Sequence, residues 1–554
     1  MSRLRERDGP VPGTLKAVSL VILVLLAGCQ SITDGSTPGN GTIAEDSGGN
    51  TMATVEVDSG LLRGDVSPFD PRIRVWRGVP YAKPPVGELR WRPPAPMSPW
   101  SGVRDATQFG ASCFQATNSS GFVWRRGDFP VSEDCLYLNV WAPEAAEGLP
   151  VMVWFHGGAH TSGQGHAAIF DGTSLAGQGV VLVTVNYRLG AFGFLAHPWL
   201  ADESEHGSAG NYGLLDKIAA LNWVQSNIAA FGGDAGNVTV FGQSAGSQSV
   251  CSLMASKLAR GLFHRAIGQS ASCVGAAPGR DADGRERGAR LAEALAASDL
   301  KTLRSKDPAE VLEASTTSGW ANASRIVIDG WVLTEPQVDT FRRQEQAQVP
   351  LLAGSLSDEG VMLFPRNDAL TDAELDTYLV RTVGDHAAAL KAVYAADHSS
   401  PGAIQHAIAT DLFMAFGMRR WAEYSADAGN PTWLYFMDHV PPAFHLYMPE
   451  DPVLMLPDGP RSVGAYHSGD LAFVFGNTRR VGVGWTEQDH TLADMMVRYW
   501  TNFARSGNPN GEGLPAWPAF TSEQLETFRL NVEPAATRGV RRQALDIMAE
   551  VLPK

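Results

Sequence analysis

Short apolar runs alternate with amphipathic stretches along most of the chain. Hydrophobic side chains dominate "PVMVWFHGG" (150–158), "GVVLVTVNYRL" (179–189) and "NVTVFG" (237–242), and each run ends at glycine or polar residues. Such runs are typical of strands that are buried on both faces of a sheet. Two similar runs, at 263–270 and 349–355, predict further strands.

Between these runs, apolar side chains recur every three or four residues, which is the period of an amphipathic helix. This pattern predicts helices at 214–231, 245–256 and 490–507, and Gly507 and Pro509 end the last of them. Strands that alternate with helices favour a large, mostly parallel central sheet with helices on both faces.

Two further regions, 275–347 and 368–428, are rich in helical patterns but less regular. We interpret them as helical insertions that cap the sheet rather than as separate domains. The chain has 554 residues, which is long enough for several average domains, yet it shows no internal repeat and no linker after residue 54. The sequence therefore predicts a single α/β domain over 54–554.

The first 28 residues, 1–28, have the features of a signal peptide. An apolar run, "AVSLVILVLLAG", follows the basic residues Arg3, Arg5, Arg7 and Lys16. The run is shorter than the roughly 20 residues that a membrane span needs. Its end, "LAGC", resembles a bacterial lipobox, which implies cleavage before Cys29 and acyl chains on that cysteine. An ordinary secretory signal is the alternative.

The segment that follows, 29–53, is rich in Gly, Ser, Thr and Asn and predicts a flexible tether. We therefore expect an exported protein of the cell envelope that is held to a membrane by a lipid anchor at Cys29. Gln30 rather than Asp follows the cysteine, which favours the outer membrane if the cell is Gram-negative.

Composition and charge narrow the function classes. The chain is 44% hydrophobic and 19% charged, as is usual for a globular protein, and its formal net charge is −15. Nucleic acid is therefore not an expected partner, because phosphate contacts need clustered Lys and Arg. Five cysteines are present. If Cys29 is lipidated, four remain, and proximity in an oxidising compartment suggests the bridges Cys113–Cys135 and Cys251–Cys273. Four free buried thiols are the alternative.

The candidate chemistry centres on "GQSAG" (242–246), a G-x-S-x-G motif between a predicted strand and a predicted helix. Small residues on both sides of Ser244 permit the sharp turn that exposes a nucleophilic serine. A plain glycine turn is the alternative. A serine nucleophile also needs a base, an orienting acid and donors for an oxyanion. The "HGGAH" segment (156–160) supplies Gly158 and Ala159 N–H groups as donors, and Ala245 N–H would be the third.

Longer stretches carry a family resemblance. The segments "FGGDAGNVTVFGQSAG" (231–246) and "EDCLYLNVWAP" (133–143) resemble the two signature stretches of the type-B carboxylesterases. This family includes bacterial para-nitrobenzyl esterases, animal carboxylesterases, some fungal lipases and the cholinesterases. The resemblance extends from about residue 54 to about residue 530, through segments such as "RGVPYAKPPVGELRWRPP" and "YWTNFARSGNPN". It implies an α/β-hydrolase fold and a serine hydrolase that cleaves carboxylic esters.

The resemblance also implies the remaining catalytic residues. Its acid position falls on Glu359 in "GSLSDEG" (354–360), and its base position falls on His467 in "HSGDLAFVF" (467–475). The order Ser, Glu, His agrees with this fold. Without the resemblance, Asp358 and the other histidines would compete for these roles. Neither a metal nor an organic cofactor is needed.

The resemblance also bears on positions outside these catalytic residues. Cys135 resembles a family cysteine that pairs with one about 25 residues earlier, which supports Cys113 as its partner. Ser270 resembles a family serine that forms hydrogen bonds near the catalytic residues. Three histidines, His156, His160 and His166, raise the question of a metal, but their spacing matches no usual zinc pattern.

Substrate preference depends on four residues that we expect to line the pocket: Gln243, His160, Trp124 and Met362. Trp124 lies near the position that binds choline in cholinesterases, but Arg125 and Arg126 follow it and oppose a cation. Gln243 stands where members of the family that it resembles usually have a glutamate directly before the nucleophile, so a negative charge is missing here. We therefore expect a small-molecule ester substrate with a short, medium or aryl group rather than a choline ester. A lipase acting on acylglycerols and a catalytically silent surface adhesion protein are the alternatives. The oligomeric state is not predicted.

Overall fold

The computed structural model describes residues 53–117, 122–275, 279–320, 325–361, 363–364 and 366–552. These residues belong to one compact unit, Met52–Lys554. The predicted signal peptide, Cys29 and all of the predicted tether except Ala53 lie outside the described residues. Among the helices that are described, none is both long and apolar enough to cross a membrane.

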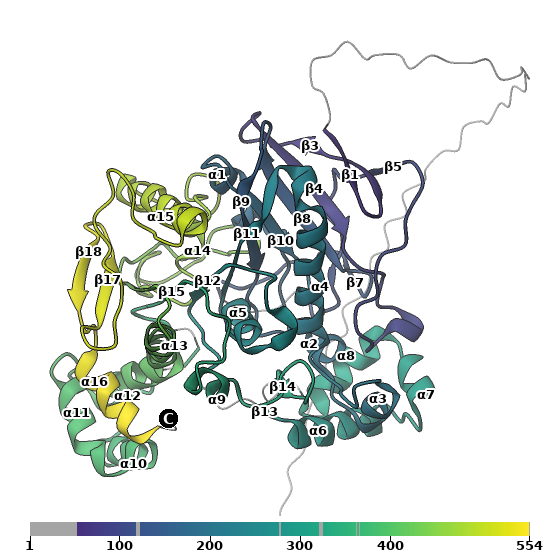
Figure 1. Ribbon diagram of the computed structural model, residues 1–554. Coiled ribbons are helices and arrows are strands. Elements are labelled where there is room, and N and C mark those ends of the chain that lie inside the picture. Colours follow the sequence, from purple (N-terminus) through teal and green to yellow (C-terminus); the bar gives the residue numbers. More distant parts are fainter. Residues whose placement is uncertain are drawn as a thin grey trace, which may run out of the picture. The chain divides into compact units, whose positions relative to one another are not determined.

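An eleven-stranded sheet forms the centre of this unit, in the order β18-β17-β16-β15-β12-β11-β9-β10-β8-β4-β3 (Figure 1). All neighbours from β10 to β17 are parallel, whereas β3, β4, β8 and β18 pair antiparallel at the two sides. The strands are β3 (Asp65–Val66), β4 (Ile73–Pro80), β8 (Tyr137–Pro143), β9 (Leu149–Phe155), β10 (Val181–Val185), β11 (Gly233–Gln243), β12 (Arg265–Gln269), β15 (Leu351–Leu356), β16 (Thr432–Met437), β17 (Glu526–Leu530) and β18 (Ala535–Arg538). The mostly parallel α/β sheet predicted from the sequence is thus confirmed.

Helices cover both faces of this sheet because its central strands are apolar on both sides. In β9, Val153 and Phe155 contribute to one hydrophobic cluster, whereas Met152 and Trp154 contribute to another. The first cluster includes side chains of α4 (Tyr212–Asn227), α5 (Ala245–Ala255) and α13 (Phe416–Asp427), and the second includes side chains of α14 (Leu471–Val474) and α15 (Glu487–Ser506). Alternate residues of one strand therefore anchor two separate helical layers.

The predicted helices are present with shifted ends. Helix α15 begins three residues before the predicted start because Thr486 and Asp489 form a capping box. It ends at Gly507, whose φ of 77° is the left-handed conformation that glycine adopts at low cost. Shorter elements precede the central strands or connect them: β1 (Thr54–Val57), β2 (Gly60–Arg63), β5 (Val103–Asp105), β6 (Ser112–Cys113), β7 (Val131–Ser132), α1 (Thr173–Ala176), α2 (Gly190–Phe194) and α3 (Pro198–Glu203).

Both predicted insertions are helix-rich. The first contains β13 (Gly279–Arg280), α6 (Asp281–Ala294), α7 (Leu300–Arg304), α8 (Pro308–Thr317), β14 (Val327–Ile328) and α9 (Gln337–Arg342). The second contains α10 (Asp372–Val383), α11 (Ala387–Ala395), α12 (Pro401–Thr410) and a π-helical turn, η7 (Asp411–Ala415), before α13. Helix α16 (Arg542–Val551) lies against this second group, as Figure 1 shows.

An ion pair joins the second insertion to the chain just before α16. Arg541 Nη1 donates to both carboxylate oxygens of Asp411, at 2.8 and 2.7 Å, and Arg541 Nη2 donates to the Ser357 carbonyl at 3.0 Å. The side chain of Asp411 is 2% exposed, so this carboxylate depends on the arginine for charge compensation. The contact fixes η7 relative to the end of β15.

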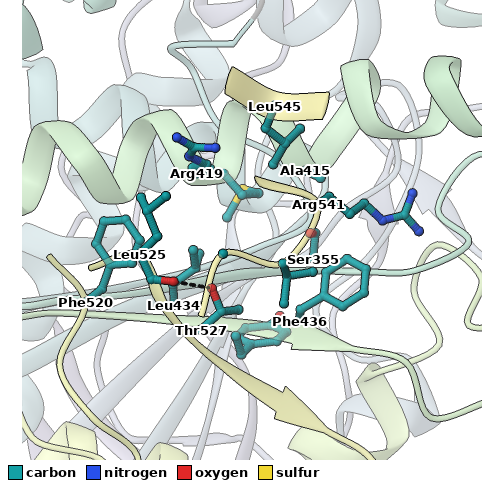
Figure 2. Close-up of a pocket in the computed structure, with 14 residues that line it drawn as sticks. Ser355, Ala415, Arg419, Leu434, Phe436, Phe520, Leu525, Thr527, Arg541 and Leu545 are labelled. Atoms are coloured by element: carbon teal, nitrogen blue, oxygen red, sulfur yellow. Dashed lines mark hydrogen bonds between the residues drawn. The ribbon is translucent and has the colours of Figure 1, made fainter. Parts of the chain in front are cut away.

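A hollow between the sheet and this helical group lies close to the same arginine (Figure 2). Its lining is mainly apolar and includes Leu434, Phe436 and Leu545, while Arg419 and Arg541 lie at its edge. Its polar side chains include Thr527, whose hydroxyl donates to the Leu525 carbonyl at 3.2 Å. No histidine or carboxylate is among the residues that line it, so the hollow offers packing space without acid–base chemistry.

The described residues contain two disulfides. Cys113 is bonded to Cys135 with a Cα–Cα distance of 4.9 Å, and Cys251 is bonded to Cys273 with a Cα–Cα distance of 5.5 Å. Both bridges that sequence proximity suggests therefore exist in the structure. The second bridge ties α5, the helix that follows Ser244, to the segment after β12.

Removing the second bridge should lower stability. The bridge spans 22 residues, and a closed loop of that length restricts the unfolded chain by about 3 kcal/mol. We expect the free energy of unfolding of the double variant Cys251→Ala/Cys273→Ala, measured by urea denaturation, to be lower by about 2–4 kcal/mol. The same double change at Cys113 and Cys135 is the matched comparison. Equal unfolding midpoints for the Cys251→Ala/Cys273→Ala variant and the oxidised protein would contradict the expectation.

Candidate active site

Ser244 occupies a strained turn between β11 and α5. Its φ of 55° and ψ of −124° lie outside the usual regions for a residue with a side chain. Its N–H donates to the Gln269 carbonyl at 2.8 Å, which fixes the turn to the adjacent strand β12. Strain of this kind persists only where the surroundings impose it.

Two glycines explain why the turn is possible. A Cβ on Gly246 would lie 1.9 Å from the Phe155 carbonyl oxygen, and a Cβ on Gly242 would lie 2.5 Å from the Gly246 carbonyl carbon. The start of α5 therefore passes so close to the end of β9 that no side chain fits between them. The G-x-S-x-G pattern is required by this close approach.

Glu359 and His467 form a buried pair. Glu359 follows β15, His467 precedes α14, and His467 Nδ1 lies 2.5 Å from Glu359 Oε2. The other carboxylate oxygen of Glu359 accepts the Leu356 N–H at 2.9 Å, and the side chain is completely buried. Because a carboxylate only accepts, Nδ1 carries the ring proton and Nε2 is left as an acceptor.

Asp358, the competing acid in the sequence, has a different position. Its Oδ2 atom accepts the Ala465 N–H at 2.9 Å and the Ser357 hydroxyl at 2.5 Å. Asp358 also forms an isolated parallel bridge with Tyr466, directly before His467. The two adjacent carboxylates are therefore distinct: Asp358 holds the backbone that carries His467, and Glu359 contacts the imidazole itself.

The "HGGAH" segment leaves backbone donors unused. Gly158 has a φ of 107° and Ala159 a φ of 53°, and the Gly158 carbonyl accepts the N–H groups of Thr161 and Ser162, both at 3.0 Å. A Cβ on Gly158 would lie 2.0 Å from the Ser162 carbonyl oxygen. Within the described part of the chain, the N–H groups of Gly158, Ala159 and Ala245 donate to no other protein group.

Gln243 contacts the histidine. Its side chain is 2% exposed, and its Nε2 atom lies 3.2 Å from His467 Nε2. Because the histidine nitrogen is an acceptor, the amide N–H donates to it. Ser244 makes no hydrogen bond with His467 in this arrangement, as is common for the catalytic hydrogen bonds of free enzymes.

Ser244, His467 and two of the three backbone donors line one cavity. The volume of this cavity is about 690 Å³ when its open mouth is included. The Trp124 indole N–H donates to the Ser468 hydroxyl at 3.1 Å, and the Trp124 and Phe413 rings lie 5.9 and 6.0 Å from the His467 ring. The described residues that line the cavity are Trp124, Arg126, Gly158, Ala159, Thr161, Ser162, Gln243, Ser244, Leu363, Phe413, Tyr447, His467 and Ser468. Met362 lies outside the described residues.

The expectation that His160 lines the pocket is wrong. His160 is not among the lining residues, its side chain is 3% exposed, and its Nε2 atom lies 3.0 Å from the Ser249 hydroxyl of α5. The left-handed backbone at this residue, with φ of 57°, directs the imidazole into the core, where it packs against Phe194. Burial there lowers the pKa of His160 well below its ordinary value.

The other two histidines of the metal hypothesis have separate partners. His156 Nδ1 lies 2.8 Å from the Gly157 carbonyl, and its ring stacks on Tyr187. His166 stacks on Phe109 instead. Among the residues that the structure describes, no group of three or more His, Cys, Asp or Glu side chains could hold a metal ion.

One buried neighbour of the pair, Asp470, was not identified from the sequence. Asp470 is completely buried, accepts hydrogen bonds from Gln269 at 2.8 Å and Tyr435 at 3.1 Å, and has its pKa raised to about 6 by burial. The signal was present, because Asp470 is the acidic residue three positions after His467. Ser270, which the family resemblance placed near the catalytic residues, is buried with a φ of 55°, but its hydroxyl has no hydrogen-bond partner among the described residues, so the expected hydrogen bond is absent.

Comparison with known proteins agrees with this arrangement. Residues 51–548 match the model of the carboxylesterase family. The fumonisin B1 esterase of Sphingopyxis macrogoltabida is 35% identical over 503 residues, covering 86% of this chain and 87% of that protein. Human carboxylesterase 3 is 34% identical over 556 residues, covering 91% of this chain and 92% of that protein. The crystal structure of the Geobacillus stearothermophilus carboxylesterase has a TM-score of 0.76 and 35% identity, covering 89% of this chain and 99% of that one. The chain therefore belongs to the carboxylesterase family and is a carboxylic ester hydrolase with the α/β-hydrolase fold.

Proposed function

We propose that the protein cleaves small-molecule carboxylic esters through an acyl-enzyme on Ser244, with His467 as the base and Glu359 as the orienting acid. The observation that carries this proposal is the buried 2.5 Å contact between Glu359 and His467 Nδ1, which leaves Nε2 directed at the cavity that Ser244 also lines. A serine hydroxyl is a poor nucleophile until such a base takes its proton.

The reaction would follow in two stages. His467 Nε2 accepts the Ser244 proton while Oγ attacks the ester carbonyl, and Glu359 stabilises the resulting imidazolium. The unused N–H groups of Gly158, Ala159 and Ala245 support the developing oxyanion, and each such donor is worth about 3–4 kcal/mol in the transition state. His467 then protonates the leaving alcohol, and water hydrolyses the acyl-enzyme by the reverse proton transfers.

Gln243 adds a step to this scheme. Its amide occupies the imidazole nitrogen that must receive the Ser244 proton, so it has to release that nitrogen when substrate binds.

For the location of the enzyme, we propose a lipid anchor at Cys29. The support is the sequence alone: a basic start, a short apolar run and "LAGC", followed by a tether rich in small polar residues.

The triad assignment is tested by substitution. Ser244→Ala should lower kcat/KM for p-nitrophenyl acetate by about 10⁴-fold or more and abolish labelling by an organophosphate. Glu359→Gln should cost about 10³- to 10⁴-fold because the ring loses its orienting carboxylate. Ser226→Ala, on the exposed side of α4, is the matched control. Turnover by Ser244→Ala within tenfold of the wild-type rate would overturn the assignment.

Replacing Gln243 should change the pH dependence. A carboxylate about 3 Å from His467 Nε2 favours the imidazolium, so Gln243→Glu should move the acid side of the kcat/KM profile up by about one pH unit. Gln243→Met, which removes the amide without adding charge, should leave that side of the profile in place. Coincident profiles for Gln243→Glu and the wild type would show that this side chain does not act on the histidine.

The anchor is tested in cells. Cys29→Ser should abolish labelling of the protein by a fatty acid, because the thiol that would carry an acyl chain is lost. Metabolic labelling with radioactive palmitate measures the change, and immunoblots of membrane and soluble fractions follow the protein itself. Equal labelling of the variant and the wild type would rule out lipidation at this cysteine.

A further inference from the structure

Arg126 is a buried cation in the wall of the Ser244 cavity. Only 2% of its surface is exposed, yet it lines the same cavity as Ser244 and His467. A guanidinium keeps its proton at neutral pH in essentially all protein environments. Burying such a charge is costly unless an opposite charge accompanies it.

The rest of the protein follows that rule. Five arginines are buried among the described residues, and four of them contact a carboxylate. The four pairs are Arg74–Glu144, Arg90–Glu133, Arg188–Asp216 and Arg304–Glu203. Arg126 alone has no carboxylate partner in the described part of the chain.

Neutral groups hold Arg126 in place. Its Nη1 atom donates to Gln115 Oε1 at 2.7 Å and to Gln164 Oε1 at 3.1 Å, and its guanidinium carbon lies 4.1 Å from the centre of the Tyr447 ring. Gln115 in turn accepts the Gly163 N–H at 2.7 Å and donates to the Gly163 carbonyl at 2.8 Å. The arginine is therefore fixed to the loop that carries the candidate oxyanion donors.

The cavity itself supplies no negative charge to accompany Arg126. None of the described residues that line it is Asp or Glu, and Gln243 is neutral. Burial lowers the pKa of Arg126, and the groups that oppose this effect are tyrosines rather than carboxylates. Lys217 is another buried basic side chain, and burial lowers its pKa well below its ordinary value. A lysine can lose its proton in this way, whereas an arginine cannot.

We propose that Arg126 binds a carboxylate of the substrate, so that the preferred substrates are esters that carry a second, ionised carboxylate group. This inference rests on the proposed function at Ser244. A hydrogen bond between guanidinium and carboxylate is about twice as strong as one between neutral groups, and it would supply the missing counter-charge. The protein's net charge of −15 repels anions, so any preference for an anionic ester must come from a local group.

The carboxylate can lie on either side of the scissile bond, and two substrate pairs distinguish the sides. On the acyl side, the p-nitrophenyl half-ester of glutaric acid is compared with p-nitrophenyl pentanoate. On the alcohol side, the butanoate ester of 4-hydroxybenzoate is compared with that of 4-hydroxybenzamide. We expect the anionic member of at least one pair to have a kcat/KM higher by about tenfold or more. A lower kcat/KM for both anionic esters overturns the inference.

Substitutions of Arg126 test whether this residue causes the preference for anionic esters. Arg126→Gln should lower the ratio of anionic to neutral kcat/KM by roughly 10- to 100-fold, and Arg126→Lys should lower it less because the charge remains. Arg125→Gln is the matched control, because Arg125 is the neighbouring arginine and is exposed. An unchanged ratio in Arg126→Gln would show that the arginine only supports the loop.

A second measurement does not depend on the folding of Arg126→Gln. Free glutarate should compete with p-nitrophenyl pentanoate in the wild type and compete more weakly in Arg126→Lys. Equal inhibition constants, or no inhibition in either protein, would contradict carboxylate binding by this side chain. If the wild type hydrolyses no ester of either charge, the proposed function fails. If it hydrolyses neutral esters without discrimination, only the role of Arg126 fails.

Discussion

The close approach of helix α5 to strand β9 is the constraint on which the site depends. Gly246 meets the Phe155 carbonyl so closely that a single added carbon would overlap it. The chain must therefore reverse within one residue, and Ser244 takes the strained conformation that results. The same approach brings the first N–H of α5 next to the loop after β9. One steric contact thus sets both the exposure of the serine and the spacing of the candidate oxyanion donors.

The parallel sheet brings the remaining groups to the same edge. Strands β9, β11 and β15 end in the same direction, and they lead to Gly158, Ser244 and Glu359. His467 arrives differently, from a long segment without strands. The Asp358 contact with Ala465 fixes that segment directly beside Glu359. The candidate site therefore combines a rigid sheet edge with one loop that depends on a few polar contacts.

Sequence patterns predicted the central strands and long helices because these are apolar on both faces or strongly amphipathic. They did not predict β3, β4, β8, β16, β17, β18 or α16. The serine motif and the family resemblance also selected residues that the structure brings together, because steric and chemical needs restrict those positions. His160 was misplaced since a positive φ, which turned its side chain inward, leaves no mark in a pattern of residue types. Arg126 was noticed only as a charge that opposes a cation. Its lack of a carboxylate partner depends on contacts between distant segments, which sequence spacing does not encode.

The ion pair between Asp411 and Arg541 makes one wall of the cavity depend on residues that are far apart in the chain. Asp411 opens η7, the turn that presents Phe413 to the cavity, and its partner follows 130 residues later in the chain. During synthesis, the strand and helix around Ser244 emerge well before Arg541 does. Until that arginine arrives, the carboxylate has no opposite charge to accompany it into the interior. The wall that Phe413 contributes to the cavity therefore depends on an ion pair with a residue far along the chain, whereas the Ser244 turn is held by its contacts with β9 and β12.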